Sequence, residues 1–113
     1  MTAKITPLRI LMGWRKYVKV VAEAVKAAIP EVKIYVTGSA VEDRLTVESD
    51  IDVLVVLPHR PSFAEAVELR AKILEEEERL GFPLYVPIEL HIIGEEELKR
   101  YARRGNVVPI DEL

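Results

Sequence analysis

Residues 38–56 read GSAVEDRLTVESDIDVLVV, and this segment carries the strongest signal in the chain. A Gly-Ser pair at Gly38 and Ser39 is followed, after ten residues, by two aspartates, Asp50 and Asp52, at the head of an apolar run. Glycine lets backbone N–H groups approach a phosphate closely, and paired carboxylates can hold Mg²⁺. With average residue usage this spacing arises by chance in roughly one of 10³ such chains. The segment predicts a phosphate-binding turn beside a metal site.

Apolar periodicity on either side of this segment predicts alternating helices and strands. The segment follows the first strand and contains most of the second, which is so apolar that burial on both faces is expected. Ser62 and Glu65 form a capping box at the start of the long second helix. The expected elements, in chain order, are a helix over residues 7–29, strands over 33–37 and 50–57, a helix over 62–80, a strand over 84–93, a helix over 95–104 and a last extended piece.

This order predicts an α+β fold, a two-layer sandwich with a small mixed sheet of three to four strands and helices on one face. The 113 residues are expected to form a single domain, 1–113, because this is close to the commonest domain length. We expect the acidic run over residues 75–78 to be a solvated helix face.

Composition excludes several classes of protein. The chain has no cysteine, which excludes disulfides and thiolate chemistry, and its net charge of −3 gives no reason to expect nucleic acid as a direct partner. No apolar run is long enough for a membrane span or a secretory signal, so a cytoplasmic protein is expected. The absence of glutamine and the single asparagine, Asn106, in a charge-rich chain are typical of thermophile proteins.

The two aspartates predict a metal site because side chains alternate along a strand, which places Asp50 and Asp52 on one face. Glu89 is the candidate third acid, since it lies within an otherwise apolar strand where an unpaired charge is costly. His91 shares the face of Glu89. Hard carboxylate oxygens, with substrate phosphate and water, are the ligands that Mg²⁺ takes.

Each of these residues also has a structural interpretation. The aspartate pair could instead cap a turn by hydrogen bonding, and Glu89 could be a charge that protects an edge strand from aggregation. His91 is more often a hydrogen-bonded or exposed strand residue than a metal ligand. His59, in a Pro-His-Arg-Pro loop, is expected to be solvated.

The Gly-Ser turn, the Asp-x-Asp pair and a later strand acid together resemble the DNA polymerase β-like nucleotidyltransferase superfamily. The length and element order are similar to its smallest branch, the minimal nucleotidyltransferase (MNT) domain. The resemblance implies that Gly38 and Ser39 bind a nucleoside triphosphate, that Asp50 and Asp52 bind Mg²⁺, and that Glu89 completes the metal site and helps to activate the acceptor. Arg44 and Ser49 are further candidates for contact with the nucleotide.

The implied reaction transfers a nucleoside monophosphate, AMP from ATP, to a hydroxyl group. Many members continue the turn as Gly-Ser-x-Ala-Arg-Gly, where this chain has Glu42 and Asp43, and Glu89 replaces the usual aspartate. These acids would repel phosphate unless Arg44 or a metal compensates. They therefore favour an alternative, a catalytically weak or inactive binding module with the same fold.

The resemblance also implies a partner. Larger members carry a second domain for the acceptor, so here the acceptor is expected on another protein or across a homo-oligomer interface. MNT proteins commonly pair with small helical HEPN-domain toxins and act as the antitoxin, in some cases by modifying a tyrosine. A small-molecule nucleotidyltransferase of the antibiotic-modifying kind is the third reading.

Overall fold

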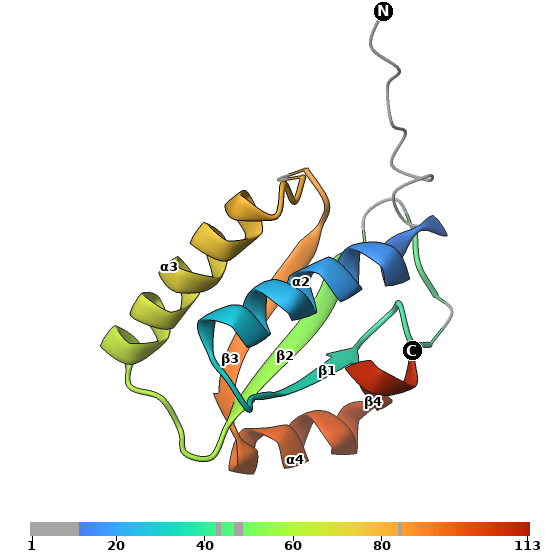
Figure 1. The fold of residues 1–113 in the computed structure, drawn as a ribbon. Coiled ribbons are helices and arrows are strands. Elements are labelled where there is room, and N and C mark those ends of the chain that lie inside the picture. The colour runs from blue at the N-terminus through green and yellow to red at the C-terminus, as the bar shows by residue number, and fades with distance from the viewer. Residues whose placement is uncertain (1–11, 43, 47–48, 84) are drawn as a thin grey trace, which may run out of the picture.

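The computed structural model describes residues 12–42, 44–46, 49–83 and 85–113, and these form one four-stranded sheet with three α-helices (Figure 1). The sheet order is β3-β2-β1-β4. The strands are β1 (Lys33–Thr37), β2 (Ile51–Leu57), β3 (Ile88–Gly94) and β4 (Val107–Pro109). The helices are α2 (Trp14–Ala28), α3 (Phe63–Arg79), α4 (Glu95–Arg104) and a closing 3₁₀ turn, η1 (Ile110–Glu112).

The sheet is mixed, as expected from the sequence. β1 pairs antiparallel with β2 and with β4, whereas β2 and β3 run parallel. β2 is an interior strand, and its side chains from Val53 to Leu57 are all buried. Burial on both faces explains why this strand is apolar without alternation.

Two layers of side chains cover the sheet, one on each face. α2 and α3 pack over the face that carries Val53 and Val55, and α2 lies in front of the sheet in Figure 1. Leu54 and Val56 point the other way and pack with Leu98 and other residues of α4. The expectation that all helices cover one face therefore needs correction for α4, which packs on the opposite face.

The helices form for local reasons that the sequence shows clearly. The buried residues of α2 recur at helical spacing and face the sheet. The Oγ of Ser62 accepts the backbone N–H of Glu65 at 3.1 Å, which caps α3. The Glu65 side chain contacts His59 instead of returning to Ser62, so the expected capping box is only half formed. The buried residues of α2 are Trp14, Val18, Val21, Ala22, Ala24 and Val25.

Two strands begin later than the sequence predicted. β2 begins at Ile51, which leaves Asp50 in the preceding loop. β3 begins at Ile88, so Glu89 is its second residue and is exposed; it is not a buried mid-strand charge. The predicted start of the first helix and residue Leu84 lie outside the described residues. β3 is an edge strand, as Pro87 suggested.

The acidic run in α3 is the other correction. Three of its members are exposed or half-buried, but Glu77 is only 5% exposed. Glu77 lies four residues after the buried Ile73, so helical geometry turns both toward the sheet. No helix among the described residues has the length and apolar character to cross a membrane.

Candidate active site

The candidate site lies where β2 and β3 begin, on the face that α4 covers. In the sheet register Asp52 of β2 lies between Thr37 of β1 and Glu89 of β3. Side chains at neighbouring register positions share a face, so the two carboxylates lie side by side. The turn at Gly38 follows Thr37 directly and therefore lies beside Asp52. Gly38, Asp52 and Glu89 are thus brought together from three parts of the chain.

Asp52, Glu89 and His91 form a cluster that could hold a metal ion. One ligand atom from each residue lies within 4.8 Å of the other two. His91 Nε2 lies 3.0 Å from Asp52 Oδ1, and both side chains are about one quarter to one third exposed. Two carboxylates and an imidazole, open to solvent on one side, are a donor set that fits a divalent cation with positions left for phosphate and water.

His91 is held in place by its neighbours. The hydrogen bond to Asp52 raises the pKa of His91 above its ordinary value of 6.5, and this effect outweighs the opposing effect of burial. The Tyr101 ring of α4 lies 5.9 Å from the His91 ring, at a tilt of 56°. Burial raises the pKa of Tyr101 above its ordinary value of 10.0, and the negative charge of Asp52 adds to the effect. Tyr101 therefore stays uncharged and packs against His91 at the side of the site.

The Gly38 turn approaches the cluster as closely as a backbone can. Gly38 has φ +88°, in the left-handed region that favours glycine, and a Cβ atom placed on it would lie 2.6 Å from Asp52 Oδ2. Ser39 follows in the same turn, and its carbonyl oxygen accepts the Arg44 N–H at 2.9 Å. A phosphate held by this turn would lie next to the Asp52 carboxylate.

Glu42 connects the turn to the end of α4. Its carboxylate pairs with the Arg44 guanidinium and accepts the backbone N–H of Asn106 at 3.4 Å. These hydrogen bonds, the one from Arg44 first, lower the pKa of Glu42 below its ordinary value of 4.5. A Cβ on Gly105 would lie 2.6 Å from Glu42 Oε2, so a side chain there would displace the Glu42 carboxylate from this position. The negative charge of Glu42 thus has partners, while Asp43 lies outside the described residues.

Thr37 makes a second connection between the same parts of the chain. Its hydroxyl donates to the Asn106 carbonyl oxygen at 2.8 Å. Thr37 is the last residue of β1 and is buried. The Gly38 turn is therefore held from both sides by the segment that follows α4.

Arg44 and Ser49 lie in the loop between the turn and β2. The Arg44 side chain is 68% exposed and is engaged by Glu42. The Ser49 hydroxyl accepts the Thr46 N–H at 2.9 Å, which closes a local turn. Neither residue belongs to the metal-ligand cluster.

Asp50 is exposed and is not part of the metal-ligand cluster found among the described residues. It lines a pocket of about 420 Å³ at the outer edge of β3, together with Glu89 and with Arg70 and Glu77 of α3. The structure thus separates the aspartate pair, with Asp52 at the cluster and Asp50 at the pocket.

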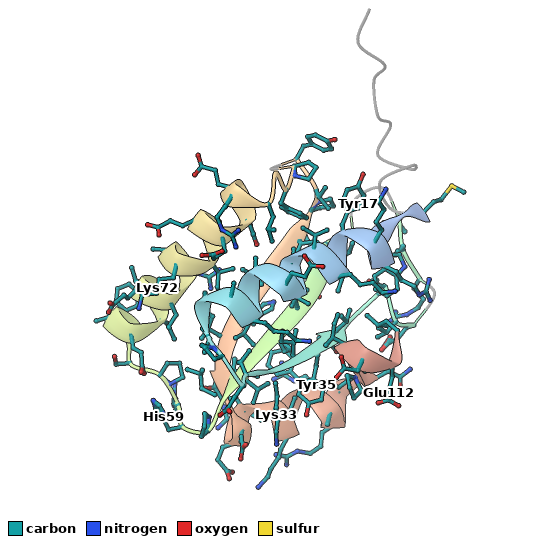
Figure 2. All side chains as sticks on the ribbon, in the orientation of Figure 1. Tyr17, Lys33, Tyr35, His59, Lys72 and Glu112 are labelled. Carbon is teal, nitrogen blue, oxygen red and sulfur yellow. The ribbon has the colours of Figure 1, made fainter. Side chains whose placement is uncertain are left out.

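The two histidines lie far apart along the sheet. His59 is exposed in the loop between β2 and α3 (Figure 2), where its Nε2 lies 3.2 Å from Glu65 Oε1. His91 lies at the cluster, and its place two residues after Glu89 was the sequence signal for it. Tyr101 had no such signal, because its role depends on α4 covering the site. The position of Glu77 in an acidic run concealed its burial.

A family model described as the nucleotidyltransferase domain matches residues 18–107. The crystal structure of a Sulfolobus solfataricus protein provisionally identified as a nucleotidyltransferase is similar, with a TM-score of 0.66, 17% identity and coverage of 96% of this chain and 89% of that one. A second provisionally identified nucleotidyltransferase structure has a TM-score of 0.51, 28% identity and coverage of 86% and 97%. No curated protein matches the chain significantly.

Proposed function

The chain belongs to the nucleotidyltransferase domain family, and from that membership we propose that it transfers a nucleoside monophosphate, AMP from ATP, to a hydroxyl group on a partner protein. The observation that carries the proposal is the approach of the Gly38 backbone to Asp52, which in turn shares a cluster with Glu89 and His91. A phosphate-binding turn beside a divalent-cation site is what nucleotidyl transfer requires.

Asp52 and Glu89 are the proposed holders of Mg²⁺, with His91 as a third ligand or as the group that orients Asp52. When bound, the ion neutralises charge on the transferred phosphoryl group and on the departing pyrophosphate. The hydrogen bond from His91 fixes the orientation of the Asp52 carboxylate before the ion binds. The carboxylate therefore needs little reorganisation to bind the ion. Asp50 stays a candidate acid on the pocket side.

Gly38 and Ser39 are the proposed triphosphate-binding residues. With no side chain at Gly38, phosphate oxygens can reach the backbone of the turn and the cluster at once. Glu42 is paired with Arg44 and hydrogen-bonded to the Asn106 N–H, so its charge is a weaker obstacle to phosphate than the sequence suggested.

Glu89 is the proposed acceptor-side residue because its side chain is exposed. In the transfer, the acceptor oxygen forms a bond to the α-phosphorus while the bond between that phosphorus and the pyrophosphate oxygen breaks. The hydroxyl proton passes to a carboxylate oxygen of Glu89.

We place the acceptor hydroxyl on a small helical HEPN-domain protein, with this chain as its antitoxin. The support for this partner is the likeness to the MNT branch. The chain also covers 89% and 97% of the two similar structures, so it matches small proteins over nearly their full length.

The test is incubation with Mg²⁺, a purified HEPN-domain partner and ATP labelled at either the α- or the γ-phosphate. We expect the α-label to appear on the partner and the γ-label to leave as pyrophosphate. The Asp52→Asn variant should transfer neither label. Partner labelling by γ-labelled ATP alone would indicate a kinase, and labelling by neither would contradict the proposal.

The alternative is a binding module that masks its partner without chemistry. Calorimetric titration separates the two functions, because the module would bind the partner tightly and Mg-ATP not at all. The partnered state of Glu42 removes part of the sequence argument for this alternative.

A further inference from the structure

The pocket at the outer edge of β3 contains a buried acid that the proposed chemistry does not use. Glu77 is 5% exposed and lines the pocket from α3. Among the described residues, no hydrogen bond or ion pair reaches its carboxylate. Every completely buried side-chain oxygen in this part of the chain has a partner, so the Glu77 carboxylate must reach the open space of the pocket.

An ionised carboxylate in this position destabilises the fold. Burial raises the pKa of Glu77 above its ordinary value of 4.5, because the carboxylate has lost much of its water and gained no partner. Leucine at this position would pack against the same neighbours without that penalty. A buried, unpaired acid facing an open pocket is typical of a group that is completed by a ligand.

The charges around the pocket indicate which ligand fits. Asp50, Glu77 and Glu89 line the pocket together with Arg70, but the Glu89 carboxylate shares the opposite face of β3 with Asp52 and His91. Arg70 is partly engaged, since its Nη2 donates to the Leu90 carbonyl oxygen at 2.9 Å. Without Glu89, the two acids Asp50 and Glu77 still face one guanidinium. The pocket therefore favours a cation over an anion.

We propose that this pocket binds a protonated amine or guanidinium carried by the acceptor, with Glu77 as its counterion. The inference rests on the proposed function only in assigning the cation to the acceptor, because cation binding itself can be measured without nucleotide. Glu89 lines the pocket and also belongs to the metal-ligand cluster on the other face of β3, so an acceptor held at Glu77 would reach Glu89 around the open edge of this strand. The volume of about 420 Å³ suits a small amino alcohol or a single basic side chain.

The experiment titrates the isotopically labelled protein with 1,3-diaminopropan-2-ol and with the peptide acetyl-Lys-Tyr-Lys-amide, and follows backbone amide resonances. Glycerol and the same peptide with acetylated lysines are the uncharged controls. We expect at least one amine probe to shift the resonances of Leu74, Glu77 and Ile88, and the controls to leave them unchanged. The free amine and the peptide distinguish a small-molecule acceptor from a protein side chain.

Glu77→Gln is the matched variant, since it keeps the shape and removes the charge. It should weaken amine binding about tenfold or more and leave binding of Mg-ATP unchanged. Glu75→Gln, an exposed acid of the same helix, should change neither. Amine binding that Glu77→Gln does not weaken, or no binding by either probe, overturns the inference. If the wild-type protein does not bind Mg-ATP, that result would instead overturn the proposed function, so the two failures are distinguishable.

Discussion

His91 donates its Nε2–H to Asp52 Oδ1 at 3.0 Å, diagonally across the parallel pair of β2 and β3. In the register Asp52 lies opposite Glu89, and His91 lies opposite Leu54. The contact therefore reaches back along the strand, and it draws three metal-binding groups into one cluster.

The two aspartates should be unequal. Asp52→Asn should lower metal affinity and nucleotidyl transfer by about 10²-fold or more, because it removes an ionised ligand from the cluster. Asp50→Asn should have a smaller effect on metal affinity, since Asp50 lies outside the cluster. Calorimetry with Mg²⁺ and Mg-ATP measures both variants. Equal losses of metal affinity would show that Asp50 also binds the ion.

Replacement of His91 should change metal preference. His91→Leu should lower Ni²⁺ affinity by about 10–100-fold and Mg²⁺ affinity by less, because imidazole suits Ni²⁺ better than Mg²⁺. His59→Leu is the matched control, since His59 is exposed in the loop between β2 and α3. The measurement is competitive titration of the two ions. A His91→Leu variant with unchanged Ni²⁺ affinity would exclude His91 as a ligand.

Two glycines with positive φ separate backbone strain from steric obstruction. Gly38→Ala and Gly81→Ala should each lose about 1–2 kcal/mol of stability, because both glycines have a left-handed backbone conformation. Only Gly38→Ala should also lose Mg-ATP binding, since its Cβ would meet Asp52 Oδ2, whereas the space around Gly81 is open. Chemical denaturation and calorimetry give the two quantities. Normal Mg-ATP binding by Gly38→Ala would refute the close approach.

Glu77 should make stability depend on pH in a defined direction. Its pKa is raised in the folded state, so ionisation destabilises the fold at pH above that raised value. The penalty is relieved as the pH falls toward the unfolded value near 4.5. Glu77→Gln should be more stable than wild type by about 1 kcal/mol at pH 8, and the difference should shrink as the pH falls to 4.5. Denaturation midpoints across this range test it, with Glu75→Gln as the control. A difference that does not change with pH would contradict the assignment.

Much of the fold was predictable because its signals are local. The strand Lys33–Thr37 and the helix Glu95–Arg104 were predicted with the bounds that the structure has, since a turn glycine follows the first and Gly105 the second. The face that α4 covers was not predictable from its own sequence. Helical periodicity identifies an apolar stripe but does not specify which side of a sheet receives it.

The sequence singled out Asp52 and Glu89 as candidate site acids, but it did not show that Asp50 lies apart from Asp52. Strand alternation placed Asp50 and Asp52 on one face only if both belonged to the strand, and β2 begins one residue too late for that. The burial of Glu77 was not predicted, because it belongs to a run of four consecutive acids and the other three are exposed or half-buried. Its burial comes from tertiary packing around Ile73, which composition does not show.

The central claim is that Asp52, Glu89 and His91 hold a divalent ion beside the Gly38 turn. Anomalous diffraction from crystals soaked with Mn²⁺ and a non-hydrolysable ATP analogue measures this directly. We expect an anomalous peak in contact with the carboxylates of Asp52 and Glu89, with the triphosphate against Gly38 and Ser39. A peak located elsewhere, or a triphosphate bound away from the turn, would contradict the account.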